Sequence, residues 1–404
     1  MILFNPWHDL SLANFAANYT PPASSIKLSE DLSLLPIWYG NSKIVIAEGD
    51  HNRLYLEKIK DLFNISCQLI SLETISSYPE EKILPWGWSP ALKRILIKHG
   101  ANEQQMPNME QLKQLRQYSD RKNAVEVLRE LQVDFSNQHV IKSSINIGNS
   151  KTLCGESYYF DNLDELLKYL NSTPGDKALK MPISGSGRGL IWILGDITDK
   201  QTDWSRRVIR EQGGIVAEPK LNKVRDFALE FYIDKGLVSF TGYSLFKSAS
   251  SGSYIGNELM SDNQIEQRLS EYVSINIIHY LRDSLHDKLS ARFTDYTGYL
   301  GVDMMICKNS DSIQITNSVQ PCVEINMRMN MGVVAHTFYK RFVKPNAEGV
   351  FKIKYFKRPG SALSFHKKKQ RESTLNVANN KIESGYLALT PVTNNTHYIA
   401  YVII

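Results

Sequence analysis

The residues best suited to chemistry lie in the segment CVEINMRMNMG (322–332), where polar and apolar side chains alternate. Glu324, Asn326 and Arg328 occupy every second position, and on a strand this spacing puts all three side chains on one face. Carboxylate and amide oxygens are ligands that suit Mg²⁺, and a guanidinium can hold a phosphate through two hydrogen bonds. The segment therefore predicts a site for a metal-bound phosphate. The alternative is the solvent-exposed face of an edge strand.

A second carboxylate precedes this segment. Asp303 stands among apolar residues in YLGVDMMI (299–306), a run that we expect to form a strand. An unpaired buried charge is costly, so an acid in such a strand needs a partner. If the two strands pair as a hairpin, Asp303 can lie beside Glu324. Two like charges held close need a cation between them or a proton on one of them, and Mg²⁺ that bridges nucleotide phosphates would meet that need.

A glycine-rich stretch, KMPISGSGRG (180–189), begins with a lysine and carries an arginine near its end. Its glycines would let backbone amides approach an anion, which favours a phosphate cradle. The alternative is the flexible tip of a surface hairpin. The flanking segments 176–182 and 189–195 are expected to be strands. Strand, loop and strand do not fit the Walker or Rossmann loops, because in both a helix follows the loop.

Two further acids lie between these motifs, in VAEPKLNKVRDFALEF (216–231). Glu218 follows an apolar strand and precedes Pro219, which lacks an N–H and suits a segment that crosses between domains. Asp226 comes eight residues later, at the start of the next expected strand. A carboxylate in that place could accept hydrogen bonds from ribose hydroxyls.

The first 115 residues have the pattern of a small α/β domain. Apolar runs of strand length occur at 1–5 and 43–49, and helical spacing of apolar residues follows at 51–64 and again at 91–100. This alternation predicts a small parallel sheet covered by helices. In the next part of the chain, the strong N-cap residues Ser119 and Asp120 predict a helix that starts directly after them.

The rest of the chain mixes strands with helices. The segment 226–246 predicts a strand pair joined by an Asp-Lys-Gly turn, and 263–289 predicts one long helix. The tail after residue 355 is polar and strand-like. Its basic run HKKKQR (366–371) is expected to be a solvated loop.

Composition excludes several classes of protein. The chain has 404 residues, with 47 basic and 42 acidic side chains, and a formal net charge of +5 does not argue for nucleic acid. The four cysteines lack CxxC spacing, which disfavours a disulfide framework or a zinc site. No apolar run approaches the ~18 residues of a membrane helix, and the N-terminus lacks the features of a signal peptide. We therefore expect a cytoplasmic protein with no membrane or nucleic-acid partner.

Taken in order, these motifs resemble the ATP-grasp superfamily of carboxylate–amine and carboxylate–thiol ligases, over roughly residues 115–340. The resemblance implies an α/β (α+β) protein whose ATP-grasp fold has two α+β subdomains, preceded by a small parallel α/β domain. It implies four regions: an N-terminal domain at 1–115, a central subdomain with a glycine-rich lid at 116–212, a subdomain with the magnesium site at 213–355, and a β-rich extension at 356–404.

The resemblance also implies roles for single residues. Asp303, Glu324 and Asn326 would hold Mg²⁺, while Lys180 and Arg328 would act on the phosphates during the reaction. Arg121 or Lys122 would contact the nucleotide at the start of the central subdomain. The remaining ATP contacts would come from the flap residues Ser184, Gly185, Ser186, Gly187 and Gly189, from the adenine and ribose residues Glu218, Pro219 and Asp226, and from Lys247.

This sequence departs from the family pattern in places. Met181 separates Lys180 from Pro182, where many relatives have Lys-Pro, and Asp226 stands where a glutamate is commoner. The N-terminal motifs NPWHDLSLANFAANYTPP and PWGW match no relative of known substrate, which leaves the substrate open. His8, Asp9 and His336 are each read as capping or packing residues, with a catalytic role as the alternative.

The function implied by the resemblance is an ATP- and Mg²⁺-dependent ligase. It would activate a small-molecule or peptide carboxylate as an acyl phosphate for attack by an amine or a thiol. One alternative is an ATP-binding module or kinase without ligase chemistry, and a second is a nucleic-acid-binding or protein-binding protein. The oligomeric state stays open between monomer and homodimer.

Overall fold

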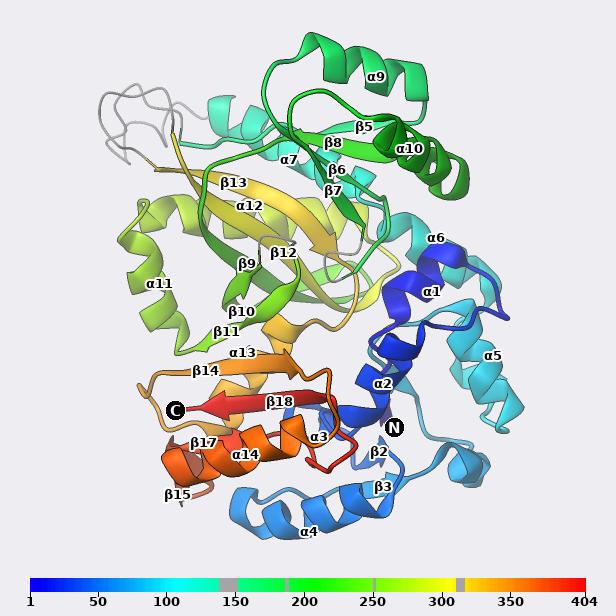
Figure 1. Cartoon of the computed structure of the whole chain (residues 1–404), viewed down its shortest axis with the longest axis vertical. Coiled ribbons are helices and arrows are strands. Elements are labelled where there is room, and N and C mark those ends of the chain that lie inside the picture. The colour runs from blue at the N-terminus through cyan, green and yellow to red at the C-terminus, as the bar shows by residue number, and fades with distance from the viewer. Residues whose placement is uncertain (138–151, 186–188, 250–251, 310–316) are drawn as a thin grey trace. The chain divides into compact units, whose positions relative to one another are not determined.

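The computed structural model describes residues 1–137, 152–185, 189–249, 252–309 and 317–404 (Figure 1). These residues form two compact units. The first unit comprises Met1–Gln114, Ile255–Ser261 and Met329–Ile404, and the second comprises Leu115–Tyr254 and Asp262–Arg328. The architecture is α/β, with one parallel sheet and several antiparallel pairings.

The first unit contains the parallel sheet that the N-terminal pattern predicts. Its strand order is β3-β2-β1-β4, and every pair in it is parallel. The strands are β1 (Ile2–Leu3), β2 (Ile44–Ile46), β3 (Gln68–Ile70) and β4 (Leu84–Pro85). The helices of this region are α1 (His8–Asn14), α2 (Ala23–Asp31), α3 (Pro36–Tyr39), α4 (Asp50–Phe63), η1 (Leu72–Ser77), α5 (Pro90–Lys98), η2 (Glu103–Gln105) and α6 (Met109–Tyr118).

An antiparallel set of strands completes the first unit. β14 pairs with β11 and β18, and β18 pairs with β17. The elements are β11 (Tyr254–Leu259), α13 (Met331–Phe342), β14 (Gly349–Tyr355), α14 (Ser361–Glu372), β15 (Asn376–Ala378), β16 (Lys381–Ser384), β17 (Tyr386–Ala388) and β18 (Tyr398–Ile403).

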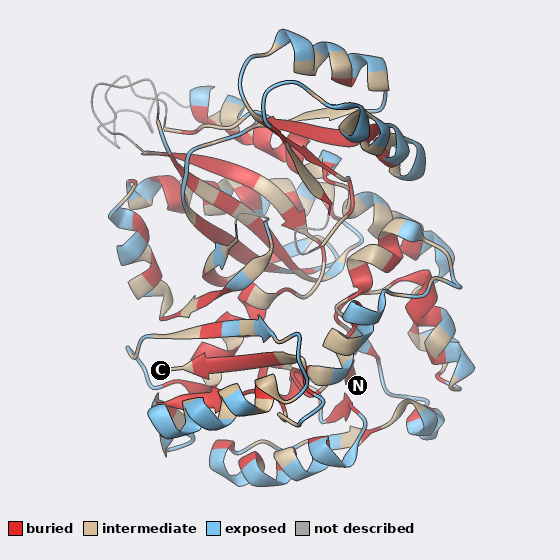
Figure 2. Ribbon diagram, viewed as in Figure 1, coloured by how far each residue is buried: buried red, intermediate tan, exposed pale blue. Residues whose placement is uncertain are grey.

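The expectation of a loop at HKKKQR is wrong, because these residues form the second half of helix α14. Ala362 is fully buried in a core cluster with Tyr386 and Tyr401, and Phe365 packs against the same cluster. Lys, Gln and Arg are themselves good helix formers. Ala362 and Phe365 in the first half therefore anchor a helix whose charged residues continue toward solvent (Figure 2).

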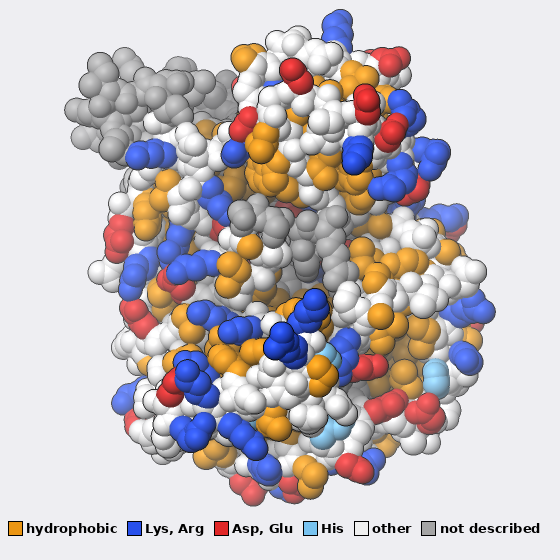
Figure 3. Space-filling model, viewed as in Figure 1, with side chains coloured by type: hydrophobic (Ala, Val, Ile, Leu, Met, Phe, Trp, Pro, Cys, Tyr) orange, Lys and Arg blue, Asp and Glu red, His pale blue; other side chains and the backbone are white. Residues whose placement is uncertain are grey.

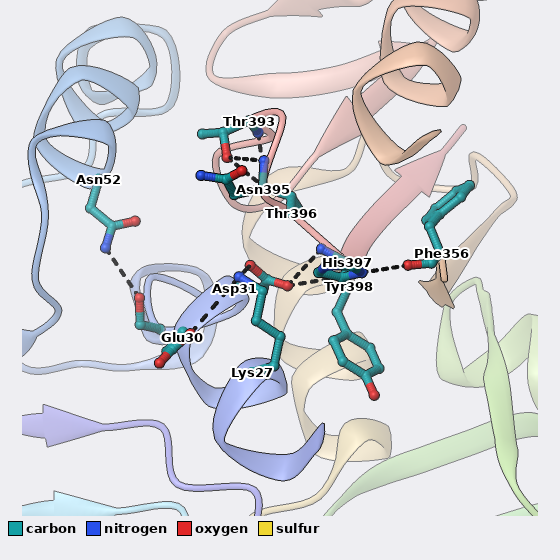
Figure 4. Close-up of polar contacts among 11 residues, drawn as sticks. Lys27, Glu30, Asp31, Asn52, Phe356, Thr393, Asn395, Thr396, His397 and Tyr398 are labelled. Carbon is teal, nitrogen blue, oxygen red and sulfur yellow. Dashed lines mark hydrogen bonds and ion pairs between the residues drawn. The ribbon is translucent and has the colours of Figure 1, made fainter. Parts of the chain in front are cut away.

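Asp31 fastens the last turn of α2 to the start of β18 within the first unit. Its carboxylate accepts hydrogen bonds from the backbone N–H groups of His397 and Tyr398, at 2.8 and 2.9 Å, and from Lys27 Nζ at 2.8 Å (Figure 4). A carboxylate that takes two backbone donors and a lysine satisfies groups that would otherwise lack partners where the strand begins. Segments from the two ends of the chain are thereby joined in one unit.

The second unit begins with an antiparallel sheet of order β5-β8-β6-β7. Its elements are α7 (Lys122–Asn137), β5 (Tyr158–Phe160), α9 (Leu163–Ser172), β6 (Lys177–Lys180), β7 (Leu190–Ile193), α10 (Asp199–Gln212) and β8 (Ile215–Pro219). The predicted helix start is confirmed, since Asp120 Oδ1 accepts a hydrogen bond from the Lys122 amide at 2.8 Å. Leu179 and Ile215 pack in the core under α9 and α10.

A second antiparallel sheet in this unit has the order β13-β12-β9-β10. Its strands are β9 (Lys223–Asp234), β10 (Leu237–Ser248), β12 (Thr297–Lys308) and β13 (Asn317–Asn326). The strand pair expected at 226–246 is confirmed. The single helix expected at 263–289 is wrong: α11 (Asp262–Ser270) and α12 (Ile275–Arg292) are separate, because Ser274 takes an extended ψ of 130° at the start of α12.

In the portion of the chain that the structure describes, none of the helices combines the length and the apolar character needed to cross a membrane.

Candidate functional site

The two carboxylates singled out in the sequence lie opposite each other in the second unit. Strands β12 and β13 pair in a register that sets Asp303 against Glu324. Asn326 Nδ2 donates to Asp303 Oδ2 at 3.2 Å, and Arg328 in turn donates to Asn326 Oδ1 at 3.2 Å. Side chains opposite each other in an antiparallel pair share a face. The hairpin that the sequence suggested therefore brings carboxylates, amide and guanidinium together.

Arg121 connects this acid face to the glycine-rich stretch. Its guanidinium donates to Glu324 Oε1 at 2.8 Å, to Ser184 Oγ at 3.2 Å and to the Met181 carbonyl at 3.1 Å. Arg121 is 7% exposed, so these bonds form away from bulk water. Segments up to 203 residues apart in the sequence thus meet at one side chain. Its neighbour Lys122, the alternative nucleotide contact, lies instead over the Tyr159 ring at 5.5 Å.

The glycine-rich stretch is a hairpin tip between β6 and β7, as expected from its flanks. The Met181 amide donates to the Gly189 carbonyl at 2.8 Å and closes the hairpin beyond the strands. At Gly189 a Cβ atom would lie 2.3 Å from Ser184 Cβ, so only glycine fits there without displacement. Gly185 is half-buried next to Ser184. Ser186 and Gly187, also expected to contact phosphates, lie outside the described residues.

Lys180 and Glu218 form a buried ion pair next to this hairpin. Lys180 ends β6, Glu218 lies in the neighbouring strand β8, and Lys180 Nζ donates to Glu218 Oε2. The two residues are 6% and 7% exposed. Ser157 Oγ donates to the other carboxylate oxygen of Glu218 at 3.0 Å, and Pro219 ends the strand. Each charge is compensated, which a buried ion requires.

Asp226 lies near the start of β9 and has two partners of its own. Lys223 Nζ and Ser248 Oγ each donate to Asp226 Oδ2 at 2.6 Å. Lys247, a further expected phosphate contact, is exposed beside Ser248 on β10. Ser248 was not singled out in the sequence, because it lies 22 residues from Asp226 and no local pattern links the two. Lys223 was missed although it is only three residues before Asp226.

Sequence reasoning missed a fourth carboxylate on the same face of this sheet. Glu230 is 1% exposed on β9, and strand alternation puts it on the face that carries Asp226. In the β12–β9 register, Ala228 lies opposite Asp303, so that face also carries Asp303 and its partner Glu324. The signal was available: Glu230 is an acid inside the apolar run FALEFY, the feature that drew attention to Asp303.

The crowding of acids changes their protonation. Burial raises the pKa of Asp303 well above its usual value, and the charges of Glu324 and Glu230 raise it further. Burial also opposes the charge of Arg121, but the attraction of Glu324, Glu218 and Asp303 outweighs it and raises the pKa of the guanidinium. The raised pKa of Asp303 means that this face favours a proton on that carboxyl group or a cation beside it.

The donor set fits magnesium. Asp303 and Glu324 lie opposite each other on β12 and β13, and Asn326 lies two positions further along β13 on the same face, so the three offer hard oxygen ligands together. Across the described stretches of the chain, no cluster of three or more His, Cys, Asp or Glu side chains could hold a metal ion alone. Mg²⁺ commonly takes only one or two protein carboxylates and completes its shell with phosphate oxygens and water. Two carboxylates and an amide suit an ion that arrives with a nucleotide.

The protonation of Asp303 should make the stability of the protein depend on pH. Because its folded-state pKa is raised, its proton stabilises the fold at low pH, and this stabilisation is lost as pH rises through that pKa. In the absence of metal, the thermal midpoint of the wild type minus that of Asp303→Asn should become more negative by a few degrees as the pH rises from 5 to 8. The two midpoints should converge below about pH 4, the ordinary carboxyl range. Thermal unfolding at each pH measures this, and a pH-independent difference would contradict the assignment.

The three residues with an alternative catalytic reading all belong to the first unit. His8 and Asp9 open helix α1, and His336 is buried in α13. A Cβ atom on Gly87 would lie 2.4 Å from His8 Cγ, so the imidazole fills the space above that glycine. The contact between His8 and Gly87 is therefore a packing contact.

No family model matches the chain, and no curated protein matches it. Solved structures with a similar backbone include biotin carboxylase from Campylobacter jejuni (12% identity, covering 100% of this chain and 86% of that one, TM-score 0.48). A second is N5-carboxyaminoimidazole synthetase from Staphylococcus aureus with ADP (14% identity, covering 84% of this chain and 83% of that one, TM-score 0.43). A third is L-amino acid ligase from Bacillus licheniformis (13% identity, covering 82% of this chain and 77% of that one, TM-score 0.42). These are ATP-grasp enzymes.

Proposed function

We propose that this protein is an ATP- and Mg²⁺-dependent ligase of the ATP-grasp type, which activates a carboxylate as an acyl phosphate for attack by an amine or a thiol. The observation that carries the proposal is the position of Arg121, bonded to both Glu324 and Ser184. This arrangement sets a glycine hairpin with its lysine beside a face of carboxylates. A phosphate chain and a divalent cation need those two surfaces close together.

In the first step, phosphoryl transfer from ATP to the substrate carboxylate, each residue of the site would have a separate role. A carboxylate oxygen of the substrate attacks the γ-phosphorus of ATP, the bond to the bridging oxygen breaks, and ADP leaves. Lys180 and Arg328 would neutralise charge on the phosphates, and hairpin amides near Ser184 would orient them. Asp303, Glu324 and Asn326 would hold the magnesium ion, which when bound neutralises the charge that develops on the phosphate oxygens.

The second step depends more on the exclusion of water from the site than on further catalytic groups. The amine or thiol attacks the carbonyl carbon of the acyl phosphate, loses its proton, and inorganic phosphate leaves. Water would compete as a nucleophile, so the hairpin over the phosphates would serve to exclude it. Glu218 and Asp226 would bind adenine and ribose, which fixes the γ-phosphate relative to the acid face.

A two-stage experiment tests the proposal. Thermal unfolding with and without MgATP should show a raised midpoint, and ADP release should then appear with one or more members of a panel of amino acids, peptides and small acids. Hydroxylamine in the same reactions should trap the acyl phosphate as a hydroxamate. ADP release without hydroxamate from any carboxylate would instead support a kinase. No stabilisation by MgATP would contradict the nucleotide site itself.

A further inference from the structure

Two tyrosines lie on the same face of the sheet as the proposed metal ligands, further along the strands. On β9, Asp226, Glu230 and Tyr232 are separated by even numbers of positions, and this stretch pairs with β12 without a shift in register. Tyr299 lies opposite Tyr232 on β12, four positions before Asp303. Side chains at even spacing share one face of a strand. Tyr299 and its neighbour Tyr232 therefore lie roughly 13 Å along the strands from the position of Asp303.

The other face of β9 belongs to the core of the second unit. Phe227, Phe231 and Ile233 are all 0% exposed, whereas Tyr232 is 37% exposed. Hydrophobic side chains, orange in Figure 3, occur at several separate places on the surface drawn there, so exposure alone does not mark a site. Tyr232 differs from a scattered surface residue, because it continues the face that carries the proposed metal ligands.

A third tyrosine and a cation gather at the same place. The rings of Tyr232 and Tyr299 form an edge-to-face pair with centres 5.0 Å apart. The Tyr296 hydroxyl donates to the Tyr299 carbonyl at 2.7 Å, and a Cβ atom on Gly298 would lie 2.9 Å from that hydroxyl oxygen. Burial raises the pKa of Tyr296, and the charge of Arg328 opposes this rise, which indicates that the guanidinium lies near the phenol. We call Tyr232, Tyr296 and Tyr299 the tyrosine cluster.

The geometry of phosphoryl transfer defines the side of the metal on which the carboxylate substrate must lie. The attacking and leaving oxygens are roughly in line through the phosphorus atom. ADP would extend toward Asp226, the proposed ribose contact. Along β12, Asp226 pairs two positions after Asp303, whereas Tyr232 pairs four positions before it. The substrate would therefore approach from the side of the tyrosine cluster.

Given the proposed ligase function, we propose that the tyrosine cluster binds the body of the carboxylate substrate, and that this body is an aromatic or large apolar group. The reacting carboxyl group would lie near Arg328, and the three rings would contact the group attached to it. Tyrosine rings suit a further flat ring in an edge-to-face or offset arrangement. A small acid without such a group would leave the cluster without contacts, so it should be a poor substrate.

Pairs of acids that differ only by a phenyl ring test the proposal. Hydroxamate formation with MgATP and hydroxylamine is measured for 3-phenylpropanoate with propanoate, and for L-phenylalanine with L-alanine. In each pair the acid with the ring should have a kcat/KM at least about tenfold higher, because ring burial favours its binding. The variant Y232A/Y299A should reduce this ratio to about threefold or less. Y232F/Y299F, which keeps both rings, should retain the ratio, and so should Tyr272→Ala, which removes a half-buried tyrosine elsewhere in the unit.

Calorimetry measures binding to the tyrosine cluster without turnover. In the presence of MgADP, 3-phenylpropanoate should bind Y232A/Y299A at least about tenfold more weakly than the wild type. Equal kcat/KM values within each pair, or an unchanged ratio in Y232A/Y299A, would overturn the tyrosine site and leave the ligase proposal standing. If no acid gave a hydroxamate, the ligase proposal would fail. The calorimetric comparison would then decide on the tyrosine site, since equal binding by both proteins, or none, would overturn it.

Discussion

Glu324→Ala should abolish ATP turnover with any carboxylate that supports it in the wild type, with a loss of about 10²–10³-fold or more. The change removes a proposed magnesium ligand that lies opposite Asp303 and accepts from Arg121. The charge of the metal–phosphate complex would then lose one of its two carboxylate partners. ADP release at saturating MgATP measures the effect.

Two further variants show whether the loss comes from the metal site. Glu324→Gln keeps an oxygen for Arg121 but loses the negative charge, so its turnover should recover partly at raised Mg²⁺ concentration. Glu271→Ala removes an exposed acid of the same unit and should leave turnover unchanged. A Glu324→Ala protein that folds normally and turns over at a near wild-type rate would contradict the proposed site.

Local patterns in the sequence predicted the parts of the fold that short-range physics controls. The apolar runs at 1–5 and 43–49 became parallel strands, and the alternation around Asp303 and Glu324 became a paired hairpin. These predictions succeed because the side-chain period of a strand is two, and because a hairpin brings near neighbours in the chain together.

The predictions failed where contacts between residues far apart in the sequence determine the local structure. HKKKQR looks like a loop in isolation, but Ala362 and Phe365 tie its helix to a core formed with β17 and β18. Glu230 is an acid in an apolar run, and its meaning depends on the β9–β12 register, which no local pattern specifies. Ser248 on β10 became visible as a partner of Asp226 only once β9 and β10 were paired.

Arg121 shows the same difference between local patterns and long-range contacts. Its position after the N-cap residues Ser119 and Asp120 was predictable, but its bonds reach 63 residues forward to Ser184 and 203 residues forward to Glu324. Sequence spacing cannot place such contacts, because loop closure over these lengths costs little more for one pairing than for another. The resemblance to a family supplied the order of the motifs, and the structure supplies their distances.

Lys180→Met should both destabilise the protein and weaken ATP binding. The lysine is the cationic partner of Glu218 in a buried pair, and removing one partner of such a pair commonly costs about 3–5 kcal/mol, because the other charge stays buried without compensation. For a unit of this size that corresponds to a fall of about 10 °C in the thermal midpoint. The proposed contact of Lys180 with the ATP phosphates would be lost as well.

The double variant K180M/E218Q separates these two effects. It removes both charges, so no uncompensated carboxylate is left, and Ser157 can still donate to the amide oxygen at position 218. Most of the lost stability should therefore return, as expected when a buried ion pair is replaced as a whole. ATP affinity should stay at least about tenfold below the wild type, measured by calorimetry with MgATP. If the double variant regained both stability and affinity, Lys180 and Glu218 would be a structural pair only, and the nucleotide would have to bind elsewhere in the unit.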